Sequence, residues 1–165
     1  MRPRRAPKSR CRRAAGFGAA RRRSSVDRLY LLDTNVVSEL RRPKAHGGVV
    51  AWLKGVPDEQ LHLSAVTLGE LQAGVEITRG QDPARAEAIE AWIDRLEQTS
   101  SVLPLDGRIF RIWARLMHRR SDDLLEDALI AATALSHDLT VVTRNVRDFA
   151  PFGVRTLNPF STGRR

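Results

Sequence analysis

The amino-acid sequence predicts an α/β fold, with a mainly parallel central sheet flanked by helices. Short apolar or β-branched runs alternate with helical patterns from Leu29 onward, and no internal repeat is found. The length of 165 residues suits a single domain. In open sheets of this kind, ligands bind outside the carboxyl ends of the strands, so the polar residues that follow each strand are the first place to look for chemistry.

Basic residues are concentrated at the N-terminus. Residues 1–28 carry a net charge of +10, whereas residues 29–165 contain 17 basic and 18 acidic residues. Residues 1–28 also lack apolar periodicity, so we expect a disordered Arg-rich tail, a folded domain over 29–160 and a C-terminal tail over 161–165. The N-terminal tail could bind nucleic acid, serve as an organellar transit peptide, or lie outside the natural protein if translation begins at a non-Met codon near Val26 or Leu29.

The composition excludes several classes of protein. A single cysteine, Cys11, cannot form an internal disulfide or a thiolate metal cluster, which fits a reducing compartment. No apolar run approaches the ~20 residues of a membrane helix, and the tail lacks the apolar segment of a secretory signal. We therefore expect a cytoplasmic protein without a membrane partner.

The first half of the domain contains the patterns of two strands and three helices. The strands are expected over Leu29–Leu32 and Leu61–Ser64. The helices are expected after Asp33, over Val66–Ile77 and from Pro83 onward, where apolar residues recur at helical spacing. Strands separated by helices indicate parallel pairing.

The second half continues the alternation. We expect an extended segment over Val102–Leu105, a helix capped by Asp106 and a further helix over about Leu124–His137. A β-branched strand follows over Thr140–Thr143, and a short edge strand over Val154–Leu157.

Asp33 is the first acidic candidate, because it directly follows the first predicted strand. An aspartate in this place often only caps the next helix. Thr34 and Asn35 could take over the capping and free its carboxylate.

Glu70 has a structural alternative of its own. Thr67 and Glu70 have the spacing of a capping box, in which the glutamate returns to the amide of the N-cap residue. Gly74 lies one turn further along, and a glycine inside a helix costs roughly 1 kcal/mol relative to alanine. We therefore expect close approach by another group on that face.

Four acids fall close together before the last long helix: Asp122, Asp123, Glu126 and Asp127. Asp123 and Glu126 have the spacing of an N-cap residue and its partner, which gives both a structural role. Asp127 is left over, and small alanines follow it along the helix. Asp127 is therefore the functional candidate of the four.

Asp33, Glu70 and Asp127 are expected to converge at one edge of the sheet, because each follows or precedes a strand. Crowded carboxylates repel each other and are tolerated only with a cation or with shared protons. Hard divalent ions that prefer oxygen ligands, namely Mg²⁺ or Mn²⁺, suit such a cluster.

Four segments together resemble the PIN-domain ribonucleases, in particular the VapC-type toxins and their FitB-like branch. The segments are Leu32–Asn35, Thr67–Leu71, Glu126–Ala134 and Thr143–Asn145, and they occur in the order found in the family. The resemblance covers about residues 29–160. It implies the toxin of a type II toxin–antitoxin system that hydrolyses RNA with Mg²⁺ or Mn²⁺, forms a homodimer and binds a cognate antitoxin.

The resemblance also implies roles for individual residues. Asp33, Glu70 and Asp127 become catalytic, metal-binding carboxylates. The fourth acidic position of the family falls on Asn145, which could bind metal through its carbonyl oxygen; three carboxylates then suit one tightly held ion. Asp148 could substitute for the missing acid, although its spacing argues against this.

Substrate binding has weaker signals. Thr34 and Thr143 could orient water or phosphate, or only cap helices. Arg111 and Arg115 belong to a basic stripe that could hold RNA phosphates or simply face solvent, and its members are Arg108, Arg111, Arg115 and Arg119. The four histidines have no partners at catalytic spacing.

Alternative functions stay open. The absent fourth acid allows a non-catalytic PIN-like protein that binds RNA or regulates. A phosphatase of the haloacid dehalogenase type is disfavoured, because Asn35 stands where that family needs a second aspartate. A DNA-binding function would depend on the basic tail.

Overall fold

The computed structural model describes residues 28–163, so the predictions for residues 1–27 and 164–165 lie outside the described part. The chain forms a five-stranded sheet in the order β3-β2-β1-β4-β5, and every neighbouring pair is parallel. The predicted α/β class is confirmed. The strands are β1 (Tyr30–Leu32), β2 (Leu61–Ser64), β3 (Ser101–Leu103), β4 (Thr140–Val142) and β5 (Thr156–Leu157).

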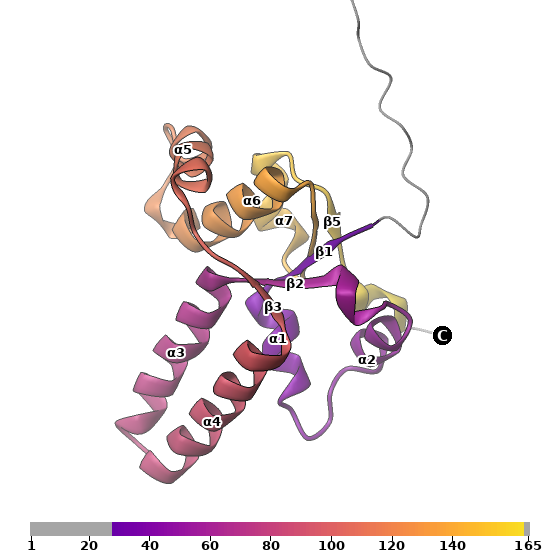
Figure 1. Ribbon diagram of the computed structural model, residues 1–165, viewed down its shortest axis with the longest axis vertical. Coiled ribbons are helices and arrows are strands. Elements are labelled where there is room, and N and C mark those ends of the chain that lie inside the picture. The colour runs from indigo at the N-terminus through magenta and orange to yellow at the C-terminus, as the bar shows by residue number, and fades with distance from the viewer. Residues whose placement is uncertain (1–27, 164–165) are drawn as a thin grey trace, which may run out of the picture.

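Helices cover both faces of this sheet (Figure 1). On one side α3 and α4 lie together as a long hairpin, and on the other α5 packs on α6. The α-helices are α1 (Thr34–Leu40), α2 (Gly47–Lys54), α3 (Ala65–Arg79), α4 (Pro83–Thr99), α5 (Gly107–Leu116), α6 (Leu125–His137) and α7 (Val146–Phe149). Short 3-10 helices are η2 (Asp58–Gln60), η3 (Asp122–Leu124), η4 (Ala150–Phe152) and η5 (Pro159–Gly163). No helix within residues 28–163 is long and apolar enough to cross a bilayer.

The central strand β1 joins two hydrophobic cores. Successive side chains of a strand point to opposite faces. Tyr30 and Leu32 therefore pack into the core beneath α1, α3 and α4, while Leu31 packs with α6 and Phe149. All three β1 residues are buried, which explains why the strand reads as a continuous apolar run. Both cores thus fix the direction in which the chain leaves β1.

The start of α3 differs from the prediction. Ser64 caps the helix, accepting a hydrogen bond from the amide of Val66, so the Thr67–Glu70 capping box is wrong. Thr67 lies within the helix and is buried, with its hydroxyl directed at the carbonyl of Leu32. Close approach at Gly74 is also wrong, because a Cβ added there would meet nothing within 4 Å.

The ends of other helices give a mixed result. Asp106 caps α5 as predicted, with its Oδ1 2.8 Å from the amide nitrogen of Ile109. Asp123 does not cap α6. Instead, Ser121 caps the preceding turn η3, and α6 begins after Leu124 without a side-chain cap.

Helix α2 has no counterpart among the sequence predictions. It starts with Gly47 and Gly48, and His46 caps it through Nδ1, 3.2 Å from the amide of Gly48. Two glycines and a histidine are weak signals for the start of a helix. The helix packs against η5, whose range includes residues 161–163 of the expected C-terminal tail.

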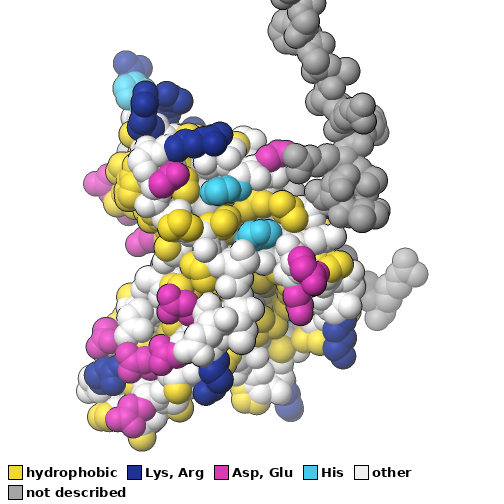
Figure 2. All heavy atoms as spheres, viewed as in Figure 1, with side chains coloured by type: hydrophobic (Ala, Val, Ile, Leu, Met, Phe, Trp, Pro, Cys, Tyr) yellow, Lys and Arg dark blue, Asp and Glu magenta, His cyan; other side chains and the backbone are white. Residues whose placement is uncertain are grey.

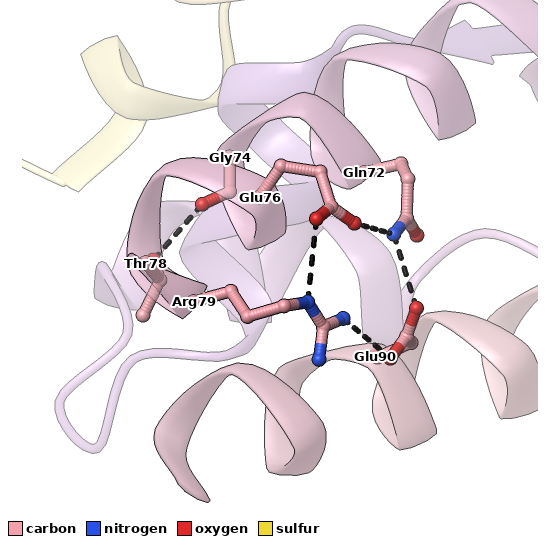
Figure 3. A network of polar contacts seen from close by, with 6 residues as sticks. All are labelled: Gln72, Gly74, Glu76, Thr78, Arg79 and Glu90. Atoms are coloured by element: carbon pink, nitrogen blue, oxygen red, sulfur yellow. Dashed lines mark hydrogen bonds and ion pairs between the residues drawn. The ribbon is translucent and has the colours of Figure 1, made fainter. Parts of the chain in front are cut away.

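The α3–α4 hairpin carries a network of paired charges (Figure 3). Arg79 lies 2.7 Å from Glu90 on α4 and 3.3 Å from Glu76 on its own helix. Gln72 donates to both glutamates, at 2.8 Å to Glu76 and 3.1 Å to Glu90. The hydrogen bond from Arg79 lowers the pKa of Glu90. This surface acid therefore has a local counter-charge.

Candidate active site

The register of the sheet brings Asp33 and Thr143 together. Strands β1 and β4 run parallel with Leu32 opposite Val142, so the residues that follow them leave the same edge side by side. Asp33 continues the pairing, because its amide donates to the carbonyl of Val142 at 3.0 Å. The carboxyl ends of the strands therefore define the site, as expected for an open parallel sheet.

Asp33 is held by hydrogen bonds on both carboxylate oxygens. Oδ1 accepts from the amide of Thr34 at 2.7 Å, and Oδ2 accepts from the Thr143 hydroxyl at 2.6 Å and from the side-chain amide of Asn35. Asp33 is itself the N-cap residue of α1, so the capping interpretation of this aspartate is confirmed and Thr34 and Asn35 do not take over the cap. The cap and the candidate site share one carboxylate.

Burial raises the pKa of Asp33. The side chain is 5% exposed, and desolvation of its charge outweighs the hydrogen bonds from Thr143, Thr34 and Asn35, which lower the pKa. The negative charge of Asp148 raises it further.

Asn35 links this carboxylate to the turn after β4. Its Nδ2 also donates to the Thr143 hydroxyl oxygen at 3.1 Å, and its Oδ1 accepts from the amide of Arg144 at 3.1 Å. The local pattern predicts an alternative cap at Asn35 but not this bridge to the turn. The available signal was an amide side chain two residues after a strand-end aspartate, a place where it can bridge to the next strand.

Glu70 reaches the same place from α3. Its Oε2 accepts from the Thr34 hydroxyl at 2.5 Å, so Thr34 joins the helix after β1 to the helix after β2. Burial, and then the charges of Asp33 and Glu126, raise the pKa of Glu70. The glutamate therefore faces the acids and not the start of its own helix.

Asp127 completes the predicted trio from the first turn of α6. Burial raises its pKa to about 6, followed by the charges of Asp33, Asp148, Glu70 and Glu126. The charges of Asp33 and Glu70 both act on it, so the three predicted carboxylates lie within electrostatic range of one another. No described residue donates a side-chain hydrogen bond to offset this repulsion at Asp127.

Asp148 is a fourth acid at this edge. Its charge raises the pKa values of both Asp33 and Asp127, so Asp148 lies within electrostatic range of them, and its part in replacing the missing acid stays a prediction. Helix α7 begins at Val146 and ends at Phe149, whose buried side chain anchors the helix in the core. Asn145, at the position expected for the fourth acid, is exposed and donates its amide to the Thr143 hydroxyl at 2.9 Å.

The donor set suits a hard divalent cation. Across residues 28–163, no three His, Cys, Asp or Glu side chains are close enough together to hold a metal ion among them. Mg²⁺ does not require three, because it is usually bound by one or two carboxylates and keeps several waters. A cation at this edge would also offset the repulsion that raises the pKa of Asp127. The residues present therefore fit Mg²⁺ or Mn²⁺.

The predicted basic stripe is shorter than expected. Arg108, Arg111 and Arg115 are exposed on α5, but Arg119 lies beyond the helix, in a left-handed conformation with φ of 61°. Figure 2 shows basic side chains gathered at the α5 end of the molecule and acidic ones over the α3–α4 hairpin. Because α5 packs on α6, the stripe belongs to the layer that carries Asp127.

Comparison with known proteins identifies the family. The family model of the PIN domain matches residues 30–152. The chain belongs to the PIN-domain family. Toxin FitB of Neisseria gonorrhoeae is 35% identical over 142 residues, covering 80% of this chain and 99% of FitB. VapC ribonuclease Y4jK of Sinorhizobium fredii is 34% identical over 143 residues, covering 80% of this chain and 98% of Y4jK.

A solved structure agrees with this PIN-domain assignment. The structure of FitAB bound to an IR36 DNA fragment contains a chain that is 31% identical, with a TM-score of 0.69. The match covers 80% of this protein and 96% of that chain. The predicted resemblance to FitB and VapC proteins is therefore confirmed.

Proposed function

We propose that this protein is the toxin of a type II toxin–antitoxin pair, and that it hydrolyses RNA phosphodiester bonds with Mg²⁺ or Mn²⁺. The observation that supports the proposal is the mutual electrostatic influence of Asp33, Glu70 and Asp127, which come from three separate segments of a PIN domain. Its relatives are named as a toxin and as a ribonuclease, which supports the same function here.

The chain's own groups divide the work of such a site. Asp33, Asp127 and Glu70 would hold the ion, with the side-chain carbonyl oxygen of Asn145 as a further ligand. The chemistry that a bound divalent ion supplies is polarisation of a phosphate oxygen and a lowered pKa for water. Thr143 and Thr34 orient Asp33 and Glu70 through their hydroxyls. No histidine is needed as a base.

Asp148 would supply the charge that Asn145 lacks. With Asp33, Glu70 and Asp127 it would bring four negative charges to the site, which two divalent ions would neutralise and one would not. We therefore propose one tightly held ion and a second that arrives with the substrate phosphate.

The partners follow from the family. Arg111 and Arg115 on α5 would contact RNA phosphates, and their loss would weaken RNA binding and reduce its salt dependence. A cognate antitoxin would bind the protein and block the acidic edge. A homodimer completes the proposed assembly.

The test is RNA cleavage by the full-length protein. End-labelled total RNA is incubated with Mg²⁺ or Mn²⁺, beside a sample in EDTA and the Asp127→Asn variant. Asp94→Asn is the matched control, because Asp94 is an exposed acid on α4 away from the site. Cleavage by the wild type and the control alone supports the proposal. RNA binding without cleavage by metal-loaded wild type would instead favour a non-catalytic PIN-like protein, the alternative suggested by Asn145.

A further inference from the structure

A second buried carboxylate lies outside the acidic edge, at Glu39 near the end of α1. It is 4% exposed. Its Oε1 accepts from the amide of His46 at 2.9 Å, while its Oε2 lies 3.2 Å from Arg42 and 3.6 Å from Arg144. A buried charge is strongly destabilising without partners, so Glu39 fixes the groups that neutralise it.

Arg144 is held from two directions. One nitrogen of its guanidinium faces Glu39, and the central carbon of the group lies over the Phe160 ring, 4.0 Å from the ring centre. Phe160 belongs to η5 and packs against the core beneath α1 and α2. Arginine suits such a place, because its planar group can pair with a carboxylate and stack on an aromatic face together.

The backbone of Arg144 connects this anchor to the proposed metal site. Its amide donates to Asn35 Oδ1 at 3.1 Å, and its carbonyl accepts from Asn158 at 3.4 Å. Asn35 in turn donates to Asp33 Oδ2 and to the Thr143 hydroxyl. A shift of Arg144 would therefore move Asn35, and with it the orientation of Asp33.

We propose that Glu39, Arg144 and Phe160 form an anchor that positions the Thr143–Asn145 turn against Asp33 and thereby sets the metal affinity of the site. The inference rests on the proposed metal-dependent function. The three anchor residues are positioning residues, acting through Asn35 and Thr143. Outer hydrogen bonds of this kind typically change metal affinity by about 10–100-fold when they are removed.

A different role for Arg144 would be direct contact with an RNA phosphate, since its side chain is 48% exposed. The two roles predict different results at Glu39, whose 5% exposed side chain is out of reach of substrate. If Arg144 acts through the anchor, loss of the Glu39 charge reproduces loss of the arginine. If Arg144 holds substrate, only its own replacement raises KM.

The experiment compares Glu39→Gln, Arg144→Ala, Arg144→Lys and the double variant of Glu39→Gln with Arg144→Ala. Arg42→Ala is the matched control, because Arg42 also pairs with Glu39 but is bound by no group of the Thr143–Asn145 turn. Mn²⁺ affinity is measured by electron paramagnetic resonance of the free ion. Hydrogen exchange is followed at the amide of Asn145, whose bond to Thr143 reports the position of the turn without metal.

We expect Glu39→Gln and Arg144→Ala each to weaken Mn²⁺ binding by about tenfold and to speed exchange at Asn145. The double variant should be no worse than either single one, because both remove one anchor. Arg144→Lys should recover part of the affinity, and Arg42→Ala should match the wild type.

Wild-type exchange at Asn145 in folded Glu39→Gln would overturn the inference, as would a KM that is raised by Arg144→Ala alone. Glu39→Gln keeps a polar group in place, so the test holds even if Arg144→Ala fails to fold. Wild-type protein that neither binds Mn²⁺ nor cuts RNA would defeat the proposed function. The exchange experiment would still show whether the anchor positions the turn.

Discussion

Two regions of the molecule contain several acidic side chains, and the pKa shifts in the two regions have opposite directions. In the α3–α4 hairpin, Arg79 lies between Glu76 and Glu90, and its hydrogen bond lowers the pKa of Glu90. At the carboxyl edge of the sheet, burial and neighbouring acids raise the pKa of Asp127 to about 6. The negative charges of the hairpin are paired with an arginine of the protein. The negative charges at the edge are not compensated in this way, so a bound cation can stabilise them.

The comparison separates acids that are paired within the protein from the acids proposed to bind metal. An acid next to an arginine gains little by binding a metal, because its charge is already compensated. Asp33 and Asp127 have no basic side chain among the causes that set their pKa values. Carboxylates whose negative charge is not compensated by a nearby basic side chain therefore indicate where a metal ion could bind.

The largest expected effect comes from removing one acid of the edge. Asp127→Asn should lower RNA cleavage about a hundredfold or more, because it removes a proposed metal ligand. Glu90→Gln removes an acid from the hairpin and should leave cleavage unchanged. Initial rates with end-labelled RNA at saturating Mn²⁺ provide the measurement. Equal losses in the two variants would break the comparison.

Metal binding at the carboxyl edge should stabilise the folded protein, and this gain should not depend on the acids of the hairpin. Mn²⁺ at a hundred times its Kd should raise the free energy of unfolding by about 2.7 kcal/mol, and EDTA should abolish the gain. Asp127→Asn should lose most of this response, while Glu90→Gln should keep it. Thermal unfolding with and without Mn²⁺ shows the difference. An undiminished gain in Asp127→Asn would mean that the ion binds elsewhere.

The raised pKa of Asp127 should also make the stability of the metal-free protein depend on pH. Asp127 has a folded pKa of about 6 against an ordinary value of 3.8, so the folded state takes up a proton that the unfolded state does not. Stability in EDTA should therefore rise as pH falls from about 7 to about 5, with no further gain from this group below its ordinary pKa. The raised pKa values of Asp33 and Glu70 act in the same direction.

Asp127→Asn should flatten this curve and raise Tm at neutral pH by about 3 °C, a modest shift because half-exposed charges are screened. Asp94→Asn serves as the control and should keep the wild-type slope. The lowered pKa of Glu90 works the other way, since its contribution is lost as pH falls through that pKa. A slope unchanged by Asp127→Asn would show that burial and neighbouring charges do not raise the pKa of this carboxyl group.

The smallest effect is expected in the hairpin itself. Arg79→Ala removes two exposed ion pairs, which contribute little in water, so Tm should fall by less than about 2 °C. RNA cleavage should be unaffected. A large loss of cleavage would show that the hairpin network reaches the active edge. Thermal unfolding and the cleavage assay in parallel settle the point.

The alternating pattern of the sequence was enough to predict the sheet and most of its helices. The strand after residue 29 and the acids Asp33 and Asp127 could be placed because strand ends and helix starts have local signals. Glu70 was harder, since the Thr67 spacing suggested a capping box, and only the actual cap at Ser64 shows otherwise. Local spacing cannot tell which of several polar residues begins a helix.

Other features depend on tertiary contacts. The place of Asp148 is decided by a one-turn helix that the buried Phe149 anchors, a length at which periodicity has no meaning. Helix α2 begins with two glycines, which have low helix propensity, and it packs on η5. Its formation therefore depends on tertiary contacts more than on local propensity. The bridge from Asn35 to Thr143 joins residues 108 apart in the sequence, beyond any local pattern.

The strand order has a consequence for synthesis. The strand formed first along the chain, β1, becomes the centre of the sheet and pairs with β4. The bond from Thr143 to Asp33 closes a separation of 110 residues. During translation, Asp33 lacks its contacts with β4 and Thr143 until these residues have left the ribosome. Nascent chains that stop short of this point hold the first acid of the site without the framework that orients it.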